Sequence, residues 1–412
     1  MNTVKQSLCT FTLVCSILMP YSECIAAFMH NTLRKKILIL SSQGGHGHEN
    51  ASQVLQEILG RDYKTAVAYP IQEGAIIPWL PAGGEGIYDY LLRNNWVRLL
   101  NCAVYYPVSS WAGWSTRIQE ARMTKIVNRE NPDFVISVIP GINYTTSKVC
   151  KALEIPFLLV TLDPELTFWL AGFTNQKHPH CVITVPDYEL VKDQLTAKGF
   201  LPEQIHTVGY PLKKSFFKAW TNNDLNILRD RYKIPEHTKV VMLMRGSSGS
   251  NKLITYANTL LTSDSRMHLV ICAGKNENLK KQLETALKPT ANVTFSVLGF
   301  TTDIPGLMKI AHTLVTAPSP NTCNEAIHSN LAILIDNTDT MLRWEKPNIT
   351  FIKKYGRNVR LFNNNDELKS FVEASLPPRK KKHRPLPNFN REIKGIVKLL
   401  LKEDAPRPES MQ

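Results

Sequence analysis

The sequence lacks the clustered cysteine and histidine spacings that hold structural zinc ions or dense disulfide frameworks. None of its eight cysteines forms a CxxC pair, and they are scattered at positions 9, 15, 24, 102, 150, 181, 272 and 323. Scattered single cysteines usually behave as small apolar residues in a reducing compartment. We therefore expect neither a metal site nor a disulfide framework in this chain.

Two common phosphate-binding signatures are also missing. The glycine-rich turn after the first expected strand reads GGHGH, which is not the GxGxxG dinucleotide pattern. A later loop, MRGSSGS, is not followed by the GK[ST] that ends a Walker loop. Any phosphate binding must then use glycine-rich loops of another kind.

Acidic residues are in deficit. The chain has 35 Asp+Glu against 49 Lys+Arg, which gives a formal net charge of +14. A surplus of this size favours an anionic partner, which is a phosphate-bearing ligand, an acidic lipid or a nucleic acid. Because the sequence contains no nucleic-acid recognition module, we do not expect nucleic acid to be that partner.

Long apolar runs are scarce. One run, from Leu8 to Met19, follows Lys5 in the manner of a signal peptide. Pro20 and Glu23 argue against an uninterrupted membrane-spanning helix. Translation from Met29, directly before the first expected strand, is the alternative interpretation. No other stretch of the sequence is long and apolar enough to span a bilayer, so we expect any membrane attachment of the body to be peripheral.

The chain does contain a repeated alternation of short apolar runs and helical spacing. The apolar runs are expected to form strands in two series, near 36–42, 133–139, 156–162, 180–185 and 204–211, and near 239–244, 268–274, 292–299, 313–317 and 332–337. Strands that alternate with helices predict parallel sheets covered on both faces. We therefore predict an α/β fold of two Rossmann-like doubly wound domains facing each other across a cleft, with ligands at the carboxyl ends of the strands.

A polar stretch over 213–235 separates the two series and predicts the boundary between them. The expected organisation is a signal-like or unstructured leader over 1–34 and a first domain over 35–212. A second domain follows over 236–376. A basic run and a C-terminal helix complete the chain over 377–412.

Two regions fall outside the alternation. Residues 76–114 are rich in tryptophan and tyrosine, with Arg93 and Arg98 interspersed. Such aromatics suit a surface that is apolar on one side and wet on the other, and Arg pairs with lipid phosphate. The alternative is that half of these aromatics belong to the core. The run RKKKHR over 379–384 is either a solvated charge run or a contact with an anionic membrane surface.

The loop QGGHGHENAS over 43–52 is the most informative short segment. Its glycines let the backbone approach a ligand, the helix start after it favours an anion, and a histidine there can act as a general base. An ordinary turn with an incidental histidine is the alternative. The segment SSQGGHGHENASQVL resembles the opening loop of the monogalactosyldiacylglycerol synthase and processive diacylglycerol glucosyltransferase group, which is glycosyltransferase family 28 with the GT-B fold. It is also similar to the related lipid-linked N-acetylglucosaminyltransferases.

The resemblance implies that a histidine of this loop activates the acceptor hydroxyl. His48 is the matching residue, because it places small and apolar side chains at the family's helix positions, and His46 is a second candidate on the acceptor side. The segment VTLDPELTFW also matches, with Asp163 as the catalytic carboxylate and Trp169 on the acceptor side. Asp163 could instead be an ordinary loop or capping residue. Arg93 is the remaining acceptor-side candidate.

The donor side of the resemblance lies in the second domain. Segments MRGSSGSNKL, LGFTTDIPGLM, APSPNTCNEAIHSN and RWEKPN resemble the family's diphosphate, base and sugar segments. The donor-binding residues that they imply are Gly246, Ser247, Ser248, Gly249, Phe300, Thr322, Glu325, Glu345 and Asn348. One segment departs from the family: a Lys and two glycines are replaced by Ala317, Ser319 and Asn321, so the loop loses a cation and backbone freedom.

The function that the resemblance implies is the inverting, metal-independent transfer of a hexosyl group from a nucleotide-sugar to a lipid acceptor such as diacylglycerol. A UDP-sugar is the expected donor. The nucleotide-sugar is a substrate, so no cofactor is expected. We expect the protein to attach peripherally to an anionic membrane surface, at the cytoplasmic face of the membrane. The signal-like N-terminal segment leaves export as the alternative. A nucleotide-sugar isomerase of the same fold and a catalytically weakened nucleotide-sugar-binding protein are the alternatives.

Overall fold

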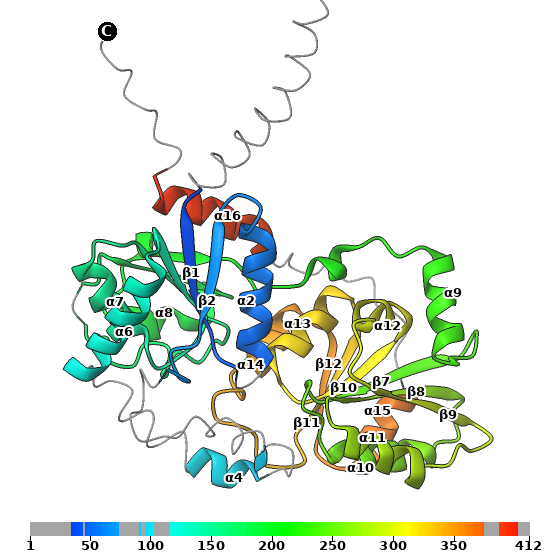
Figure 1. Cartoon of the computed structure of the whole chain (residues 1–412). Coiled ribbons are helices and arrows are strands. Elements are labelled where there is room, and N and C mark those ends of the chain that lie inside the picture. Colours follow the sequence, from blue (N-terminus) through cyan, green and yellow to red (C-terminus); the bar gives the residue numbers. More distant parts are fainter. Residues whose placement is uncertain are drawn as a thin grey trace, which may run out of the picture.

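Two six-stranded parallel sheets, each covered by helices, form the body of the protein (Figure 1). This computed structural model describes residues 34–43, 46–73, 90–91, 96–102, 116–175, 177–374 and 387–402. The α/β class predicted from the alternating runs is confirmed. We refer to the sheet of strands β1–β6 with its helices as the first unit, and to the sheet of β7–β12 with its helices as the second.

The first sheet has the strand order β2-β1-β3-β4-β5-β6. Its inner strands are continuous runs of Ile, Leu, Val and Phe that are buried on both faces, as a covered parallel sheet requires. The strands are β1 (Lys36–Leu40), β2 (Lys64–Ala68), β3 (Phe134–Ser137), β4 (Phe157–Val160), β5 (Cys181–Val185) and β6 (Ile205–Thr207). The helices are α2 (His46–Leu59), α4 (Val97–Leu100), α6 (Arg117–Glu130), α7 (Asn143–Ala152) and α8 (Tyr188–Thr196).

The second sheet has the order β12-β11-β10-β7-β8-β9, in which the direction of winding reverses between β7 and β10. Ligands of doubly wound sheets bind at such a switch point, beyond the carboxyl ends of the strands. The strands are β7 (Lys239–Met244), β8 (Met267–Gly274), β9 (Val293–Gly299), β10 (Thr313–Thr316), β11 (Ala332–Asp336) and β12 (Arg357–Phe362). The helices are α9 (Asn222–Arg231), α10 (Lys252–Leu261), α11 (Glu277–Ala286), α12 (Ile304–Ile310), α13 (Pro320–His328), α14 (Asn348–Tyr355) and α15 (Asn365–Glu373).

The two strands that the sequence pattern missed, β2 and β12, are the edge strands of their sheets. Both are only partly buried over most of their length, so neither has the continuous apolar run of an inner strand.

The stretch 213–235, expected to be a polar boundary, contains helix α9. The Thr221 side chain caps this helix by accepting a hydrogen bond from the Asp224 backbone N–H, and the helix packs on α12.

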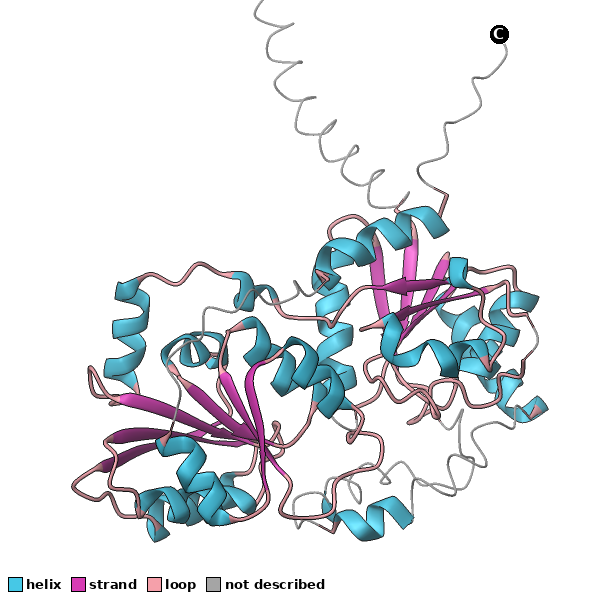
Figure 2. Cartoon of the chain, turned by 180° about the vertical axis from the view of Figure 1, so that it is seen from behind, coloured by secondary structure: helices cyan, strands magenta, loops and turns pink. Residues whose placement is uncertain are grey.

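The last helix returns the chain to the first unit. Helix α16 (Phe389–Leu400) lies beside α2 and the strands β1 and β2, and Figure 2 shows the same arrangement from behind. Its apolar positions recur every three to four residues, and their side chains are buried in the core of the first unit. The Lys35 Nζ atom donates to the carbonyl of Leu401 at 2.9 Å, and Lys394 pairs with Asp62 at 3.1 Å.

A buried polar contact joins the two units. Asp187, at the start of α8, accepts hydrogen bonds from the Lys354 ammonium and, at 2.8 Å, from the Tyr355 hydroxyl of α14. Beside it, the rings of Tyr210 and Phe351 meet edge to face with their centroids 5.0 Å apart. Charged and aromatic groups of both units are thus packed against each other at one edge of the cleft.

The part of the aromatic region that the structure describes reaches across to the second unit. The side chain of Arg98 donates to the Thr340 hydroxyl at 3.2 Å, and Asn101 exchanges hydrogen bonds with the backbone of Met341 and Arg343. Most of 76–114, including Arg93, lies outside the described residues, as does the basic run over 379–384. Among the helices that the structure describes, none is both long and apolar enough to span a bilayer.

The Asp187 contact generates a stability prediction. Replacing Asp187 with Asn keeps an acceptor for the helix cap at Glu189 but removes the charge that faces Lys354 and Tyr355. We expect the free energy of unfolding in urea to fall by about 1–3 kcal/mol, the range for a hydrogen bond to a charged group. Asp193→Asn, at an exposed position of the same helix, is the control. Equal urea midpoints for the two variants would contradict the prediction.

Candidate active site

The site begins at the turn from β1 into α2. His48 lies in the first turn of α2, and its Nδ1 atom is 2.7 Å from the backbone carbonyl oxygen of Val138, just after β3. A carbonyl oxygen can only accept, so Nδ1 carries the proton and Nε2 is the nitrogen that can receive one. The chain reverses its winding direction between β1 and β3, so this histidine stands at the switch point of the first sheet. His46 begins the same helix, and its side chain is not among those described.

Trp169 connects His48 with Asp163. The indole ring is buried and meets the His48 ring edge to face, with the centroids 5.9 Å apart. The indole N–H donates to Asp163 Oδ2 at 3.3 Å, and the Trp169 carbonyl accepts from the Asn143 amide at 3.1 Å. His48, Asp163 and Trp169 therefore form one contiguous group, which joins the two residues predicted to be catalytic to Trp169 of the predicted acceptor side. Asn143 is a supporting residue that the sequence did not indicate.

Asp163 of the first unit also lies near a carboxyl group of the second unit, that of Glu345. Burial and the nearby charge of Glu345 raise the pKa of Asp163 to about 7, against the lowering effect of hydrogen bonds from Trp169 and Asn348. Burial also raises the pKa of Glu345 to about 7, although the Arg245 guanidinium acts in the other direction. Two carboxyls with pKa values near neutrality can hold or exchange protons at physiological pH, which makes them candidates for a functional site.

Helix α13 supplies the third carboxyl. Glu325 lies on this helix, and burial raises its pKa to about 7, with Lys213 acting against the shift. Thr322 is buried on the same helix. The start of α13 faces the opening loop of the first unit, since a Cβ atom on Gly47 would be only 3.0 Å from the Asn321 amide nitrogen. Asn348 fixes the loop before α13 by donating to the Pro318 carbonyl at 3.1 Å.

The glycine-rich loop after β7 is held by its own backbone. Gly246 and Gly249 have φ angles of +70° and +69°, and a Cβ atom on Gly249 would lie 2.4 Å from the Ala273 carbonyl. Only glycine is accommodated at that position without moving the backbone. The Ser247 carbonyl accepts from the Lys275 N–H at 2.7 Å, which seats the loop on the turn after β8. Phe300, beyond β9, is 62% exposed with the Lys275 ammonium 5.5 Å from its ring centroid.

The structure therefore divides the predicted residues into two groups. One group lies around the contact between the units, and it consists of His48, Asp163, Trp169, Thr322, Glu325, Glu345 and Asn348. The other follows the carboxyl edge of the second sheet, and it consists of Gly246, Ser247, Ser248, Gly249 and Phe300. Within the described ranges, no group of three or more His, Cys, Asp or Glu side chains is arranged to hold a metal ion.

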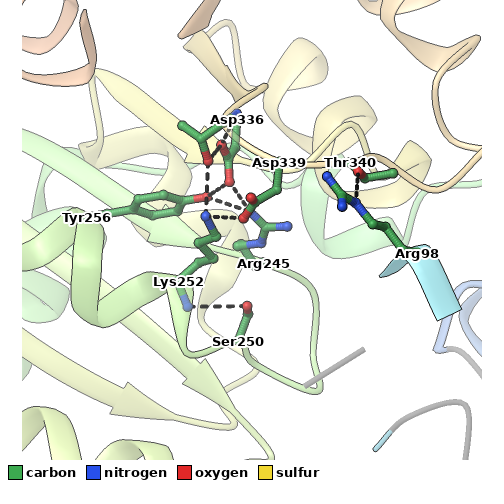
Figure 3. A network of polar contacts seen from close by, with 9 residues as sticks. Arg98, Arg245, Ser250, Lys252, Tyr256, Asp336, Asp339 and Thr340 are labelled. Atoms are coloured by element: carbon green, nitrogen blue, oxygen red, sulfur yellow. Dashed lines mark hydrogen bonds and ion pairs between the residues drawn. The ribbon is translucent and has the colours of Figure 1, made fainter. Parts of the chain in front are cut away.

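A polar network at the same edge was not predicted (Figure 3). Arg245 donates to Asp336 and to the Tyr256 hydroxyl, and Lys252 contacts Asp339 and the Thr338 hydroxyl. A signal for it was present in the sequence: Arg245 and Asp336 each come directly at the end of an apolar strand run, where side chains of parallel sheets face ligands.

The raised pKa values predict how stability depends on pH. Folded protein holds a proton on Glu345 up to about pH 7, whereas an unfolded chain releases it near pH 4.3. The folded state thus binds more protons in between, and its stability falls as pH rises through about 7. Glu345→Gln should raise the free energy of unfolding at pH 8 by about 1–3 kcal/mol and change it little at pH 5. The exposed Glu284→Gln is the control. A gain that is equal at both pH values would contradict the assignment.

Comparison with known proteins shows which proteins the whole chain is similar to. No model of a known protein family matches the chain. It is 23% identical over 363 residues to the processive diacylglycerol β-glucosyltransferase of Bacillus subtilis (strain 168), covering 86% of this chain and 90% of the relative. Among solved structures, MurG of Acinetobacter baumannii has a TM-score of 0.53 at 11% identity, covering 89% of this chain and 99% of that one. The UDP-GlcNAc 2-epimerase of Neisseria meningitidis bound to UDP-GlcNAc has a TM-score of 0.53 at 14% identity, covering 89% and 100%.

These likenesses confirm both the two-unit fold and the resemblance that the opening loop and the donor segments indicated. The chain is a protein of the GT-B fold whose sequence resembles the processive diacylglycerol glucosyltransferases of glycosyltransferase family 28.

Proposed function

We propose that this chain is an inverting glycosyltransferase that moves a hexosyl group from a UDP-sugar to a lipid acceptor such as diacylglycerol. The observation that carries the proposal is the meeting of His48, Trp169 and Asp163 of the first unit with Glu345 of the second across the cleft. The similarity to a processive diacylglycerol β-glucosyltransferase over 86% of the chain supports the same activity. The UDP-sugar is a substrate, and no cofactor is part of the proposal.

In the proposed reaction His48 is the general base. The acceptor hydroxyl oxygen attacks the anomeric carbon from the face opposite to the diphosphate, its proton passes to His48 Nε2, and UDP leaves with the bonding electrons. The hydrogen bond from Nδ1 to the Val138 carbonyl holds the ring and places its proton on Nδ1, so the basic lone pair of the neutral ring is on Nε2. Asp163 accepts the hydrogen bond that holds Trp169 against that ring, and with its pKa raised to about 7 it is proposed to exchange protons during transfer.

The donor half of the proposal rests on the second unit. Backbone N–H groups of the loop 246–250 and the start of α13 favour the negative charge that develops on the departing diphosphate. Glu325 and Thr322 are proposed to bind hydroxyls of the ribose or the sugar, with Glu345 and Asn348 on the sugar side. Phe300 is proposed to contact the base.

A lipid acceptor requires a way to meet a membrane surface. Tyr90, Trp96 and Leu99 are 58%, 53% and 50% exposed, and all three belong to the described part of the aromatic region. Large apolar side chains together with the net charge of +14 favour peripheral attachment to an anionic surface, which we propose to be a cytoplasmic membrane face.

The general-base role predicts the effect of one substitution. His48→Ala should lower the rate of sugar transfer by about 10²–10⁴-fold, the usual contribution of a positioned base, and leave UDP affinity within a few-fold. Transfer is measured with labelled UDP-sugars, and UDP affinity by calorimetry. His46→Ala is the matched control from the same helix. If His46→Ala abolishes transfer while His48→Ala is silent, the register of the loop is wrong by two residues.

The acceptor is tested with the full chain, labelled UDP-glucose or UDP-galactose, and diacylglycerol in phosphatidylglycerol vesicles. We expect label in the lipid fraction. Sugar isomers formed without lipid would establish the isomerase alternative, and UDP binding without turnover would establish a binding protein.

Vesicle attachment has its own expected outcome. Co-sedimentation with phosphatidylglycerol vesicles should fall steeply with salt, because such attraction is screened over about 8–10 Å at physiological ionic strength. Leu99→Ser should weaken it, whereas Ile227→Ser, at a similarly exposed position of α9, should not. Failure to co-sediment with phosphatidylglycerol vesicles even at low salt would remove the membrane from the proposal.

A further inference from the structure

The loop after β10 lacks the cation that its family resemblance leads one to expect, because Ala317 stands where the lysine would be. A diphosphate in this cleft would then face backbone N–H groups alone at that point. The register of the second sheet shows which residues lie next to Ala317. Val315 of β10 pairs with Leu243 of β7, and Thr316 pairs with Ile335 of β11. Continuing each pairing by about one or two residues sets Ala317 between the ends of β7 and β11.

The Arg245 side chain extends from the end of β7 across the end of β10. Arg245 is the first residue after β7 and Asp336 is the last of β11, with β10 between these two strands. Neighbouring strands are about 4.8 Å apart, so an ion pair between β7 and β11 has to span the end of β10. Arg245 Nη1 makes that ion pair with Asp336 (Figure 3).

The contacts of Arg245 hold it in place and leave part of it available. Both hydrogen bonds that its side chain makes, to Asp336 and to the Tyr256 hydroxyl, come from Nη1. Nε and Nη2 donate to no acceptor within the described part of the chain, and the side chain is 16% exposed. A guanidinium has five N–H groups in a rigid fork, and this geometry matches phosphate oxygens. The guanidinium is therefore held through Nη1, while the N–H groups of Nε and Nη2 can donate to a ligand.

The surroundings point to an anion in the same place. The Arg245 guanidinium is close enough to Glu345 to lower the pKa of that carboxyl against the larger effect of burial, so its charge acts on the predicted sugar side of the site. The loop that begins with Gly246 follows it directly, and the N–H groups of that loop favour the same kind of ligand. The hydroxyl of Thr316, at the end of β10, is buried and has no hydrogen-bond partner among the residues described.

Lys252, the other cation of the network, is engaged differently. Its ammonium contacts both Asp339 and the Thr338 hydroxyl, so its charge is met within the network. Arg245 is the one of these two cations that spans the switch point of the sheet, between β7 and β10.

We propose that Arg245 is a diphosphate-binding residue, which supplies from the end of β7 the cation that is missing at Ala317. Asp336 and Tyr256 position its guanidinium, and Nε and Nη2 donate to oxygens of the diphosphate of the nucleotide-sugar donor. This inference rests on the proposed function, since it assumes a nucleotide-sugar donor in the cleft. It assigns a specific contact that the glycine-rich loop by itself does not provide.

The test compares UDP with uridine in calorimetry on the full chain. Arg245→Met should weaken UDP binding by about 10- to 100-fold, the expected loss of charged hydrogen bonds, and leave uridine affinity within about two-fold. A double variant that adds Ala317→Lys to Arg245→Met should regain most of the UDP affinity, because it restores a cation at the same strand end. Arg231→Met, which removes an arginine paired with Asp303 on the surface, is the matched control and should change neither affinity.

Arg245→Lys keeps the assay informative if the methionine variant does not fold. It preserves a charge opposite Asp336 but loses the second arm of the fork, so UDP affinity should fall several-fold with uridine unchanged. Equal UDP affinity in the wild type and the Arg245 variants would overturn the inference while leaving the proposed function intact. Equal losses for UDP and uridine would also overturn it, because they indicate a structural role. If the wild-type chain binds no UDP, the proposed function fails and this inference fails with it.

Discussion

Asp187 of the first unit accepts hydrogen bonds from Lys354 and Tyr355 of the second, and the relative placement of the two sheets depends on this buried contact. A buried carboxylate needs its partners, because an unpaired charge away from water costs several kcal/mol. The packed rings of Tyr210 and Phe351 extend the contact. Every group proposed to act in the reaction is brought to its counterpart by the way these two surfaces meet.

Loss of hydration explains most of the raised pKa values of the carboxyl groups at this site. Asp163 comes from the loop after β4, while Glu325 and Glu345 come from the second unit, and burial raises the pKa of each to about 7. The raised pKa of Asp163 thus depends in part on Glu345 of the other unit, whose charge adds to the effect of burial.

The second sheet brings three strand ends of different sequence position together at one edge. Residues 245, 317 and 336 are far apart in the sequence, but they stand side by side because parallel strands end at one edge. Arg245 can reach over Ala317 for this reason, and its pairing with Asp336 fixes the direction of its guanidinium. The loop after β10 has no cation at Ala317, but Arg245 from the end of β7 brings a positive charge to the same sheet edge.

The sequence alone determined the fold class, because continuous apolar runs alternating with helical spacing leave few arrangements other than covered parallel sheets. It also predicted His48 and Asp163 as catalytic residues, through the resemblance of two short segments to a glycosyltransferase family. It did not reveal the edge strands β2 and β12, whose half-exposed pattern is weak, nor the pairing of Asp187 with Lys354. Only the tertiary structure decided which charges face one another, because contacts between distant strand ends depend on sheet order and on the docking of two units, and no local pattern encodes either.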